Sequence, residues 1–349
     1  LVDDLDGLVD GEVRFDDYTK QLYATDASAY EVTPIGVVFP TSTADVAAAV
    51  EYCAEREIPV LPRGGGTSLA GQSVNEAVVL DFTQEMDGLL SLDAEAATAT
   101  AEAGIYLGDL NAAIEEYGLK FAPDPAWGDK SALGGAIGNN STGAHSLKYG
   151  KTDAYIEEVE AVLADGTVTT LGEVPLSEIR TEADPEGEII ERVYAEVARI
   201  LDEEAEEVDR RYPDLKRNVS GYSLDVLVDE ASNGKTVNLA RLLAGSEGTL
   251  AVVTEATVSL EPLPETKSVA LLTYDGLVEA MEDVAPILDH GPAAVEVMDD
   301  VLLDLAADTA EFGEVVRTLP DGTEAVLLVE FYADNDEHGR EQVANLVAD

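Results

Sequence analysis

Basic residues and cysteine are scarce in this sequence. Its 349 residues include 20 Lys and Arg against 72 Asp and Glu, a formal net charge of -52 at pH 7. Such an acidic chain cannot neutralise a phosphate backbone, so nucleic acid is excluded as a partner. One cysteine, Cys53, leaves no disulfide and no cysteine-held cluster within these residues. Its helical spacing from Val46 and Val50 predicts a small core residue.

Long apolar runs, an initiator methionine and a secretory signal sequence are also missing. No stretch reaches the ~18 apolar residues of a membrane span, so none is predicted. The chain begins at Leu1 without a Met or a secretory apolar region, which we interpret as a cytoplasmic protein and a fragment of a longer one. A hydrophobic fraction of 46% and this length predict a folded chain of about two domains.

The acidic residues are scattered along the chain instead of forming one tail. Their mutual repulsion opposes compaction in dilute buffer. At 1 M salt the screening length falls to ~3 Å, which removes most of that repulsion. The pattern therefore indicates a halophilic surface, and an acidic surface that binds a partner is the alternative.

The first 120 residues predict an acidic lead-in segment, 1–30, followed by a small α/β unit. Helix-start residues after Pro40 and short apolar runs bounded by turn residues carry this interpretation. In order, the pattern predicts a helix from residue 43, strands at 58–61, 77–81 and 97–103, and a helix at 109–117.

Beyond residue 120 the composition changes. Residues 121–150 are rich in Gly, Pro, Asn and Ser and predict little regular structure. The pair Asp165-Gly166 predicts a hairpin turn, and apolar spacing predicts a helix over 186–207. Two prolines near residue 263 mark a boundary. The strand-helix alternation that follows predicts a second α/β domain, incomplete at the end of the sequence.

Glycine-rich loops recur at four places in the first 262 residues. In the first, three adjacent glycines precede Thr67 and Ser68, so backbone N–H groups and hydroxyls are open to phosphate oxygens. The second adds two amide side chains, which suit the polar edge of a flat heterocycle. A plain connecting loop is the alternative for any one of them. No Rossmann-type glycine fingerprint is present, which disfavours a nicotinamide site. The four loops are 62–73, 134–150, 218–222 and 245–249.

Three of these loops, with Pro123-Asp124-Pro125, resemble the FAD-binding domain of the vanillyl-alcohol oxidase and p-cresol methylhydroxylase superfamily. The resemblance is to its glycolate oxidase, D-lactate dehydrogenase and D-2-hydroxyglutarate dehydrogenase branch. The run Gly138-Asn139-Asn140-Ser141 with His145-Ser146 resembles the subset that is fused to a C-terminal iron-sulfur portion.

The resemblance implies an α+β fold, in which a two-subdomain FAD-binding fold is followed by a truncated ferredoxin-like α/β cap domain. The implied domains are a lead-in segment at 1–30, an FAD-binding domain at 31–262 with subdomains 31–120 and 121–262, and the incomplete start of a substrate or cap domain of the FAD-linked oxidase C-terminal type at 263–349.

The resemblance also implies which residues surround FAD. The backbone of the first loop would hold the pyrophosphate, the second would line the ADP and isoalloxazine portions, and the fourth would close one side. The implied residues are Pro62, Arg63, Gly64, Gly65, Gly66, Thr67, Ser68, Gly71, Gln72, Ser73, Pro123, Asp124, Gly134, Gly135, Ile137, Gly138, Asn139, Asn140, Ser141, Gly143, Glu247, Gly248 and Val252. Relatives with covalent FAD often carry a histidine where this chain has Thr67, which predicts non-covalent FAD.

The implied reaction is oxidation of a D-2-hydroxy acid, such as D-lactate, D-2-hydroxyglutarate or glycolate, to the 2-oxo acid. Electrons would then pass from the flavin to an iron-sulfur or other carrier. His145 lies in a flavin motif and is the candidate base, with bracing of the loop as its alternative role. Arg63 and Lys148 are candidates for binding the substrate carboxylate, with structural roles as the alternative. The His-x-Gly-Asp-Gly-Asn-x-His motif of relatives is absent, so no metal ligand is predicted.

Two other functions fit the same residues. One is an FAD oxidase for sugars or alcohols, against which the missing first-loop histidine speaks. The other is a non-catalytic FAD-binding subunit that transfers electrons and docks a redox partner through its acidic face.

Overall fold

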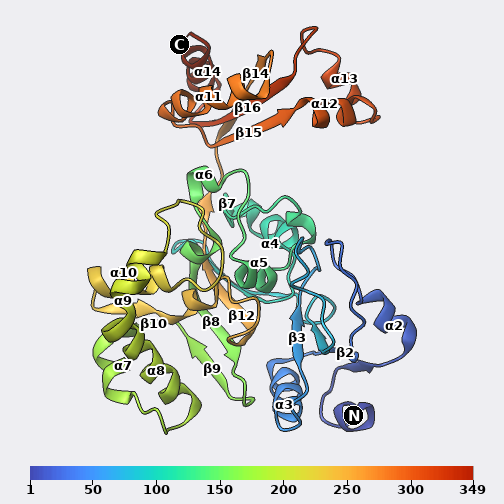
Figure 1. The fold of residues 1–349 in the computed structure, drawn as a ribbon, viewed down its shortest axis with the longest axis vertical. Helices are drawn as coiled ribbons and strands as arrows, with labels where there is room; N and C mark the ends of the chain where they lie inside the picture. Colours follow the sequence, from blue (N-terminus) through green and yellow to red (C-terminus); the bar gives the residue numbers. More distant parts are fainter. Residues whose placement is uncertain (349) are drawn as a thin grey trace. The chain divides into compact units, whose positions relative to one another are not determined.

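The computed structural model describes residues 1–348 and separates into two compact units. The first unit contains residues 1–142 and 151–261, and the second contains residues 143–150 and the chain from residue 262 onward. Figure 1 shows the C-terminal part of the second unit in orange to red. The chain therefore leaves the first unit after Thr142 and re-enters it at Lys151.

The first unit is built on two sheets. One is four-stranded, with β2, β4 and β3 parallel and β1 antiparallel at the edge. The other is five-stranded and antiparallel. In spatial order the strands are β1 (Glu12–Arg14), β2 (Gly36–Phe39), β4 (Val78–Asp81) and β3 (Val60–Arg63), and then β5 (Leu89–Asp93), β6 (Thr98–Glu102), β12 (Val252–Ser259), β8 (Ile156–Val162) and β9 (Val168–Leu171).

Helices and short strands complete the first unit, and helix α5 packs against β12 and β6 of the five-stranded sheet. The α-helices are α1 (Val2–Asp6), α2 (Asp17–Leu22), α3 (Thr43–Ala54), α4 (Leu107–Ile114), α5 (Leu133–Asn139), α7 (Leu176–Glu182), α8 (Ile189–Arg199), α9 (Ala205–Arg211) and α10 (Leu224–Asn233). The 3-10 or π turns are η1 (Glu115–Tyr117), η2 (Gly128–Lys130), η3 (Thr152–Tyr155), η4 (Ile200–Glu204) and η5 (Leu239–Leu243), and the short strands are β7 (Leu119–Lys120), β10 (Glu173–Pro175), β11 (Thr236–Asn238) and β13 (Glu261–Pro262).

The core of the first unit follows directly from its apolar runs. Every residue of β2 and β4 is buried, as expected for strands inside a parallel sheet. Helix α3 begins at Ser42, whose hydroxyl accepts from the Asp45 N–H, and packs Val46, Val50 and Cys53 into this core. The core position predicted for Cys53 is confirmed, and burial raises the pKa of its thiol to about 11. Cys53 is therefore an inert packing residue.

The strand predicted at 97–103 is present as β6, which pairs with β5 and β12 of the second sheet. Two sequence expectations need correction. Residues 121–150 are not largely irregular, because they contain α5, which buries Leu133, Ala136 and Ile137 despite its glycines. The helix predicted over 186–207 is interrupted by the π turn η4 and continues to Arg211. The hairpin at Asp165-Gly166 is confirmed by the pairing of β8 with β9.

The second unit is a three-stranded antiparallel sheet with α11 and α14 packed on one face. Apolar residues of the sheet, such as Phe331 and Leu327, pack with Ile287 of α11 and Leu346 of α14. The strand order is β14-β16-β15. The elements are α6 (Ser146–Tyr149), β14 (Thr266–Tyr274), α11 (Leu277–Asp289), β15 (Ala294–Asp299), α12 (Asp300–Ala307), α13 (Gly313–Val316), β16 (Ala325–Ala333) and α14 (Asp336–Ala348).

Three glutamates form a row across the five-stranded sheet. Glu255 of β12 lies directly opposite Glu102 of β6 on one side and Glu160 of β8 on the other. Glu102 accepts the Gly88 N–H at 2.7 Å, and Glu160 accepts the Thr43 hydroxyl at 2.6 Å. Burial, and then the charges of Glu160 and Glu102, raise the pKa of Glu255. The central carboxylate is therefore destabilising when it is charged.

We predict that Glu255→Gln increases the free energy of unfolding at pH 7 by about 0.5 to 1 kcal/mol, because two like-charge contacts are removed. The raised pKa means that the folded state favours the protonated carboxyl. The advantage of the variant should thus be full at neutral pH and shrink as the pH falls toward the ordinary carboxyl pKa. Urea unfolding at pH 7 and pH 4.5 measures it.

The control is Glu173→Gln, since Glu173 lies opposite the neutral Asn238 in the β10-β11 pair. This variant should leave stability at pH 7 nearly unchanged. A Glu255→Gln protein that is less stable than the parent at pH 7 would contradict the prediction. It would show that the Glu255 carboxylate stabilises the sheet by more than its repulsion from Glu102 and Glu160 destabilises it.

Candidate cofactor site

Three of the predicted glycine loops interlock in the first unit. A Cβ on Gly65 would lie 1.7 Å from the Lys130 carbonyl oxygen, and one on Gly64 would lie 2.7 Å from the Ala132 methyl group. A Cβ on Gly248 would lie 2.5 Å from the Pro62 ring. Side chains at these positions would force the loops apart. Much of the glycine content therefore serves contact between loops.

Backbone hydrogen bonds join the second and fourth loops. The Glu247 N–H donates to the Gly138 carbonyl at 2.9 Å, and the Gly245 N–H donates to Ile137 at 3.1 Å. The third predicted loop, 218–222, lies behind the fourth, because a Cβ on Gly245 would meet the Gly221 carbonyl oxygen at 2.5 Å. Loops that are distant in sequence thus form one connected wall.

This wall encloses a cavity of about 520 Å³, which lies entirely in the first unit. The size is within the ordinary range for organic ligands. Its predicted lining residues are Pro62, Arg63, Gly64, Gly65, Gly66, Thr67, Ser68, Gln72, Ser73, Gly134, Gly135, Gly138, Asn139, Ser141, Glu247 and Gly248. Half of the residues that line the cavity are thus among those that the resemblance implies for FAD.

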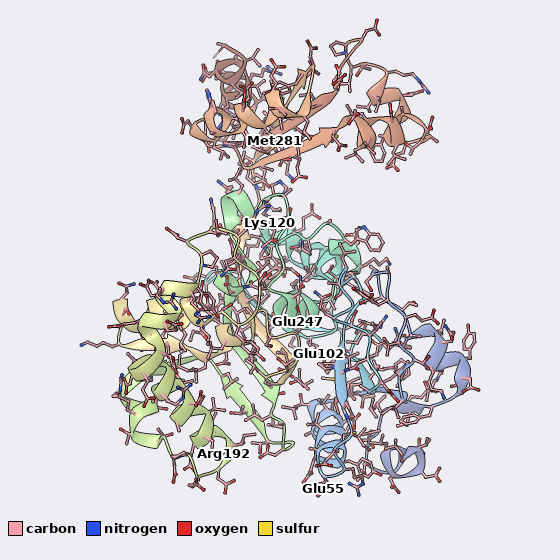
Figure 2. All side chains as sticks on the ribbon, viewed as in Figure 1. Glu55, Glu102, Lys120, Arg192, Glu247 and Met281 are labelled. Atoms are coloured by element: carbon pink, nitrogen blue, oxygen red, sulfur yellow. The ribbon has the colours of Figure 1, made fainter. Side chains whose placement is uncertain are left out.

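The cavity wall is nearly free of acid. Although 72 of the 349 residues are acidic, Glu247 is the one carboxylate among the lining residues of the described chain. Glu247 and Glu102 are labelled in the middle of the first unit in Figure 2. Hydroxyl groups replace acids here, for example Thr67 and Ser131, whose oxygens are 3.2 Å apart. In a chain of charge -52, this composition suits an anionic ligand.

Arg63 braces the first loop instead of reaching into the cavity as a free cation. Its guanidinium donates to the carbonyl oxygens of Ser73 at 2.7 Å and Thr25 at 2.8 Å. It also lies 5.2 Å from the centre of the Tyr23 ring, and the Tyr23 hydroxyl donates to Asp81. Burial lowers the pKa of Arg63. Of the two roles considered for Arg63, the contacts favour the structural one.

The two predicted amide side chains have different surroundings. Asn140 is buried and left-handed at the end of α5, with φ at 47°, and its amide nitrogen donates to Asp153 at 3.0 Å. Asn139 lines the cavity and donates to the Ser141 hydroxyl at 3.1 Å. Only Asn139 is therefore placed to meet a ligand, and Asn140 orders the turn.

Several predicted residues lie outside the cavity wall. Ile137 and Val252 are buried, and Val252 belongs to the apolar core. Gly71 packs against Tyr30, where a Cβ would be 2.8 Å from the ring. Pro123 is buried in the segment before the wall, and Asp124 lies beside it. Gly143 and His145 belong to the segment that folds with the second unit.

In the second unit, His145 lies beside an unexpected carboxylate. Its Nε2 is 3.0 Å from Glu330 Oε1, and its ring stacks on Tyr332 with centroids 5.4 Å apart. The bond to His145, followed by Lys267, lowers the pKa of Glu330 against the opposing effect of burial. Glu330 therefore presents a carboxylate to the imidazole.

The sequence predictions did not include several residues that line the cavity or contact His145. Trp127 lines the cavity and is 63% exposed, and Ser131, Ser246 and Phe82 line it as well. Trp127 is the single tryptophan of the chain, in a Gly- and Pro-rich stretch, and this was an available signal. The sequence also offered an indication for Glu330, because it is the one acidic residue inside the apolar run of β16.

The interlocked loops and acid-poor cavity define a domain that binds an extended anionic cofactor. Residues 34–172 match the family described as FAD binding domain, and residues 263–349 match the C-terminal domain of FAD linked oxidases. These two segments are similar to both domain families, and the family descriptions indicate FAD as the cofactor. The predicted α+β, two-subdomain FAD-binding fold is confirmed.

Curated relatives carry names of 2-hydroxy acid enzymes. The chain is 33% identical to the D-2-hydroxyglutarate dehydrogenase of Pantoea ananatis, matching 93% of this chain and 32% of that protein. It is 32% identical to glycolate oxidase subunit GlcD of Bacillus subtilis, over 92% of this chain and 57% of that subunit. It is also 32% identical to the D-lactate dehydrogenase of Archaeoglobus fulgidus, over 82% of this chain and 51% of that enzyme. The chain thus spans between a third and somewhat over half of these relatives.

Solved structures show the same fold. An alkyldihydroxyacetonephosphate synthase matches with a TM-score of 0.67 at 17% identity, over 96% of this chain and 56% of that one. Within residues 1–348 no helix has both the length and the apolar character needed to cross a bilayer. Across the same residues, no three His, Cys, Asp or Glu side chains are grouped to hold a metal ion.

Gly135 tests the cavity directly. It lines the cavity, and a Cβ added there would have nothing within 4 Å, so Gly135→Leu should fill ligand space without disturbing the protein. Because leucine favours a helix over glycine by up to ~1 kcal/mol, the variant should melt no lower than the parent. We predict that it purifies with less than about a tenth of the parent's FAD, measured by absorbance.

The control is Gly276→Leu, which also adds a side chain in open space but lies at the start of α11 in the second unit. It should retain the parent's FAD content. A Gly135→Leu protein with full flavin would show that FAD does not occupy this cavity.

Proposed function

We propose that this chain is the flavin-binding part of a dehydrogenase that oxidises a D-2-hydroxy acid to the 2-oxo acid. The acid-poor cavity in a strongly acidic chain is the observation that carries the proposal. The names of the relatives indicate the substrate class. When bound, FAD would supply the hydride acceptor, while the protein supplies binding, orientation and charge.

The proposed cofactor residues are those of the cavity wall. Backbone and hydroxyl groups of Gly64, Thr67 and Ser68 would hold the pyrophosphate, and Gly135 and Asn139 would face the remainder of FAD. Gly135 supports the fit, since it leaves open the space that a Cβ would fill. Thr67 stands where a linking histidine would be needed, so we propose that FAD is held without a covalent bond.

We further propose that His145 takes the hydroxyl proton. In the tautomer that donates Nε2–H to Glu330, Nδ1 is the nitrogen that accepts a proton. The Glu330 carboxylate would then stabilise the imidazolium that forms, as in other His-carboxylate pairs. The proton leaves the substrate oxygen for Nδ1 as the hydride leaves C2, which gives the 2-oxo acid.

The setting of the reaction is also a proposal. We infer that residues 31–262 form the FAD-binding domain and that residues from 263 begin the substrate domain. Electrons would pass on to an iron-sulfur or other carrier in the same or a second chain, and the protein would act in the cytoplasm. Reading the sequence on both sides of this chain would test the carrier, since cluster-binding cysteines are expected there.

We predict that D-lactate, D-2-hydroxyglutarate or glycolate bleaches the flavin of the anaerobic full-length protein. His145→Gln should slow bleaching by at least ~100-fold, because a positioned base contributes 10²–10⁴-fold to such steps. Stopped-flow absorbance in the visible flavin band measures both rates. Flavin content and melting temperature should be those of the parent.

L-lactate and L-2-hydroxyglutarate are the matched controls, and neither should bleach the flavin at a comparable rate. Bleaching by sugars or simple alcohols alone would instead support an FAD oxidase of that class. A flavin that no hydroxy acid reduces would support the non-catalytic electron-transfer subunit and contradict the proposal.

We also propose that the scattered acids adapt the surface to high salt. Their repulsion is screened over ~3 Å at 1 M salt. The melting temperature should therefore rise steeply between 0.1 and 3 M KCl, which scanning calorimetry measures. Choline chloride serves as a second salt, since screening alone requires a similar rise. A melting temperature independent of KCl would favour the alternative of an acidic docking surface.

A further inference from the structure

Cationic side chains gather around one tyrosine in the second unit. Lys148 Nζ is 5.7 Å and Lys267 Nζ is 5.4 Å from the centre of the Tyr332 ring. His145 stacks on the same ring. Glu330 is the carboxylate of this cluster, 3.0 Å from His145 Nε2 and 3.6 Å from Lys267 Nζ. We call these five residues the Tyr332 cluster.

The sheet places this cluster on the face opposite α11 and α14, and α6 supplies Lys148 on the cluster's own face. Lys267 pairs with Tyr332 across β14 and β16, and Glu330 is two residues from Tyr332 on the same strand. Side chains two residues apart on a strand share a face. The intervening Phe331 is fully buried against the helices on the other face. Neither α11 nor α14 therefore covers the cluster.

The cluster has more positive than negative charge. Two lysines and one histidine surround a single carboxylate, Glu330, in a chain where acids outnumber bases 72 to 20. Within residues 1–348, Lys148 contacts the rings of Tyr149 and Tyr332 and has no carboxylate at ion-pair distance. Lysine over an aromatic ring contributes modestly to stability at an exposed site. Two ammonium groups near one ring therefore leave a net positive charge, which can attract an anion.

The surroundings indicate what kind of anion. Val269 lies on the same face as Lys267, two residues along β14, and is 49% exposed. Leu271, two residues further, is 44% exposed. Positive charge beside a short aliphatic surface suits a small organic carboxylate better than a bare inorganic anion.

We propose that Lys148 and Lys267 bind the carboxylate of the hydroxy acid beside the Tyr332 ring. This rests on the proposed function and deepens it, because the sequence left the carboxylate-binding residue open between Arg63 and Lys148. Arg63 is held by backbone carbonyl groups. Lys267 was not singled out by the sequence at all. The nearby His145–Glu330 pair is then the proton acceptor for the hydroxyl group of the same molecule.

The test uses the FAD-loaded full-length protein and two readouts. Lys148→Gln and Lys267→Gln should each raise the substrate concentration for half-maximal flavin bleaching by about 10-fold, since each removes a charge-assisted hydrogen bond. Both should weaken oxalate binding by a similar factor in calorimetry, which needs no flavin chemistry. Lys267→Arg, which keeps the charge, should restore most of the oxalate affinity.

The control is Lys20→Gln, which removes a lysine paired with Asp17 on the surface of the first unit. It should change neither readout. Bleaching and oxalate binding that are unchanged in both cluster variants would overturn the inference while leaving the proposed function intact. Oxalate binding that depends on the lysines in a protein that no hydroxy acid bleaches would support the carboxylate site and contradict the function. Inorganic phosphate that binds the cluster more tightly than oxalate would overturn the assignment to a carboxylate.

Discussion

The close contact between glycine loops is the constraint on which the first unit depends. Gly64 and Gly65 lie against residues 130–132, and Gly248 lies against Pro62, at distances that no side chain at these positions would allow. Each contact joins segments that are distant in sequence. Together they fix where the loops at the ends of β3 and β12 and the start of α5 meet. The cavity exists because these loops pack on one another and not simply because glycine is flexible.

Acidic residues are unevenly distributed over the protein. The surface carries most of the 72 acids, yet one carboxylate lines the cavity and one lies in the Tyr332 cluster. FAD and a hydroxy acid are both anions, and each would be repelled by an acidic wall. The cavity and the Tyr332 cluster, which we assign to these two ligands, are thus poor in acidic residues. This correspondence links composition to function more directly than the overall charge does.

The sequence predicted what is local and missed what depends on partners far along the chain. The buried strands, the start of α3 after Ser42 and the hairpin at Asp165-Gly166 follow from local pattern. Half of the cavity-lining residues were named by the family resemblance. The partner of β6 is β12, which lies some 150 residues later, and no local signal identifies it. Helix α5 was missed because its buried residues outweigh the low helix propensity of its glycines. Glu330 meets His145, 185 residues earlier in the sequence, only in the folded second unit.

Added salt should affect the binding of FAD and the hydroxy acid differently from anion binding by a protein of ordinary charge. In dilute buffer the general negative charge repels an approaching anion over ~10 Å or more, while the lysines of the Tyr332 cluster attract it only at short range. Molar salt screens the long-range repulsion almost completely, but it weakens close, partly buried contacts much less. Under the proposed salt adaptation, added salt would remove a barrier to anion binding as well as the repulsion that opposes folding. An acidic surface and anionic ligands are compatible if salt is abundant where the protein works.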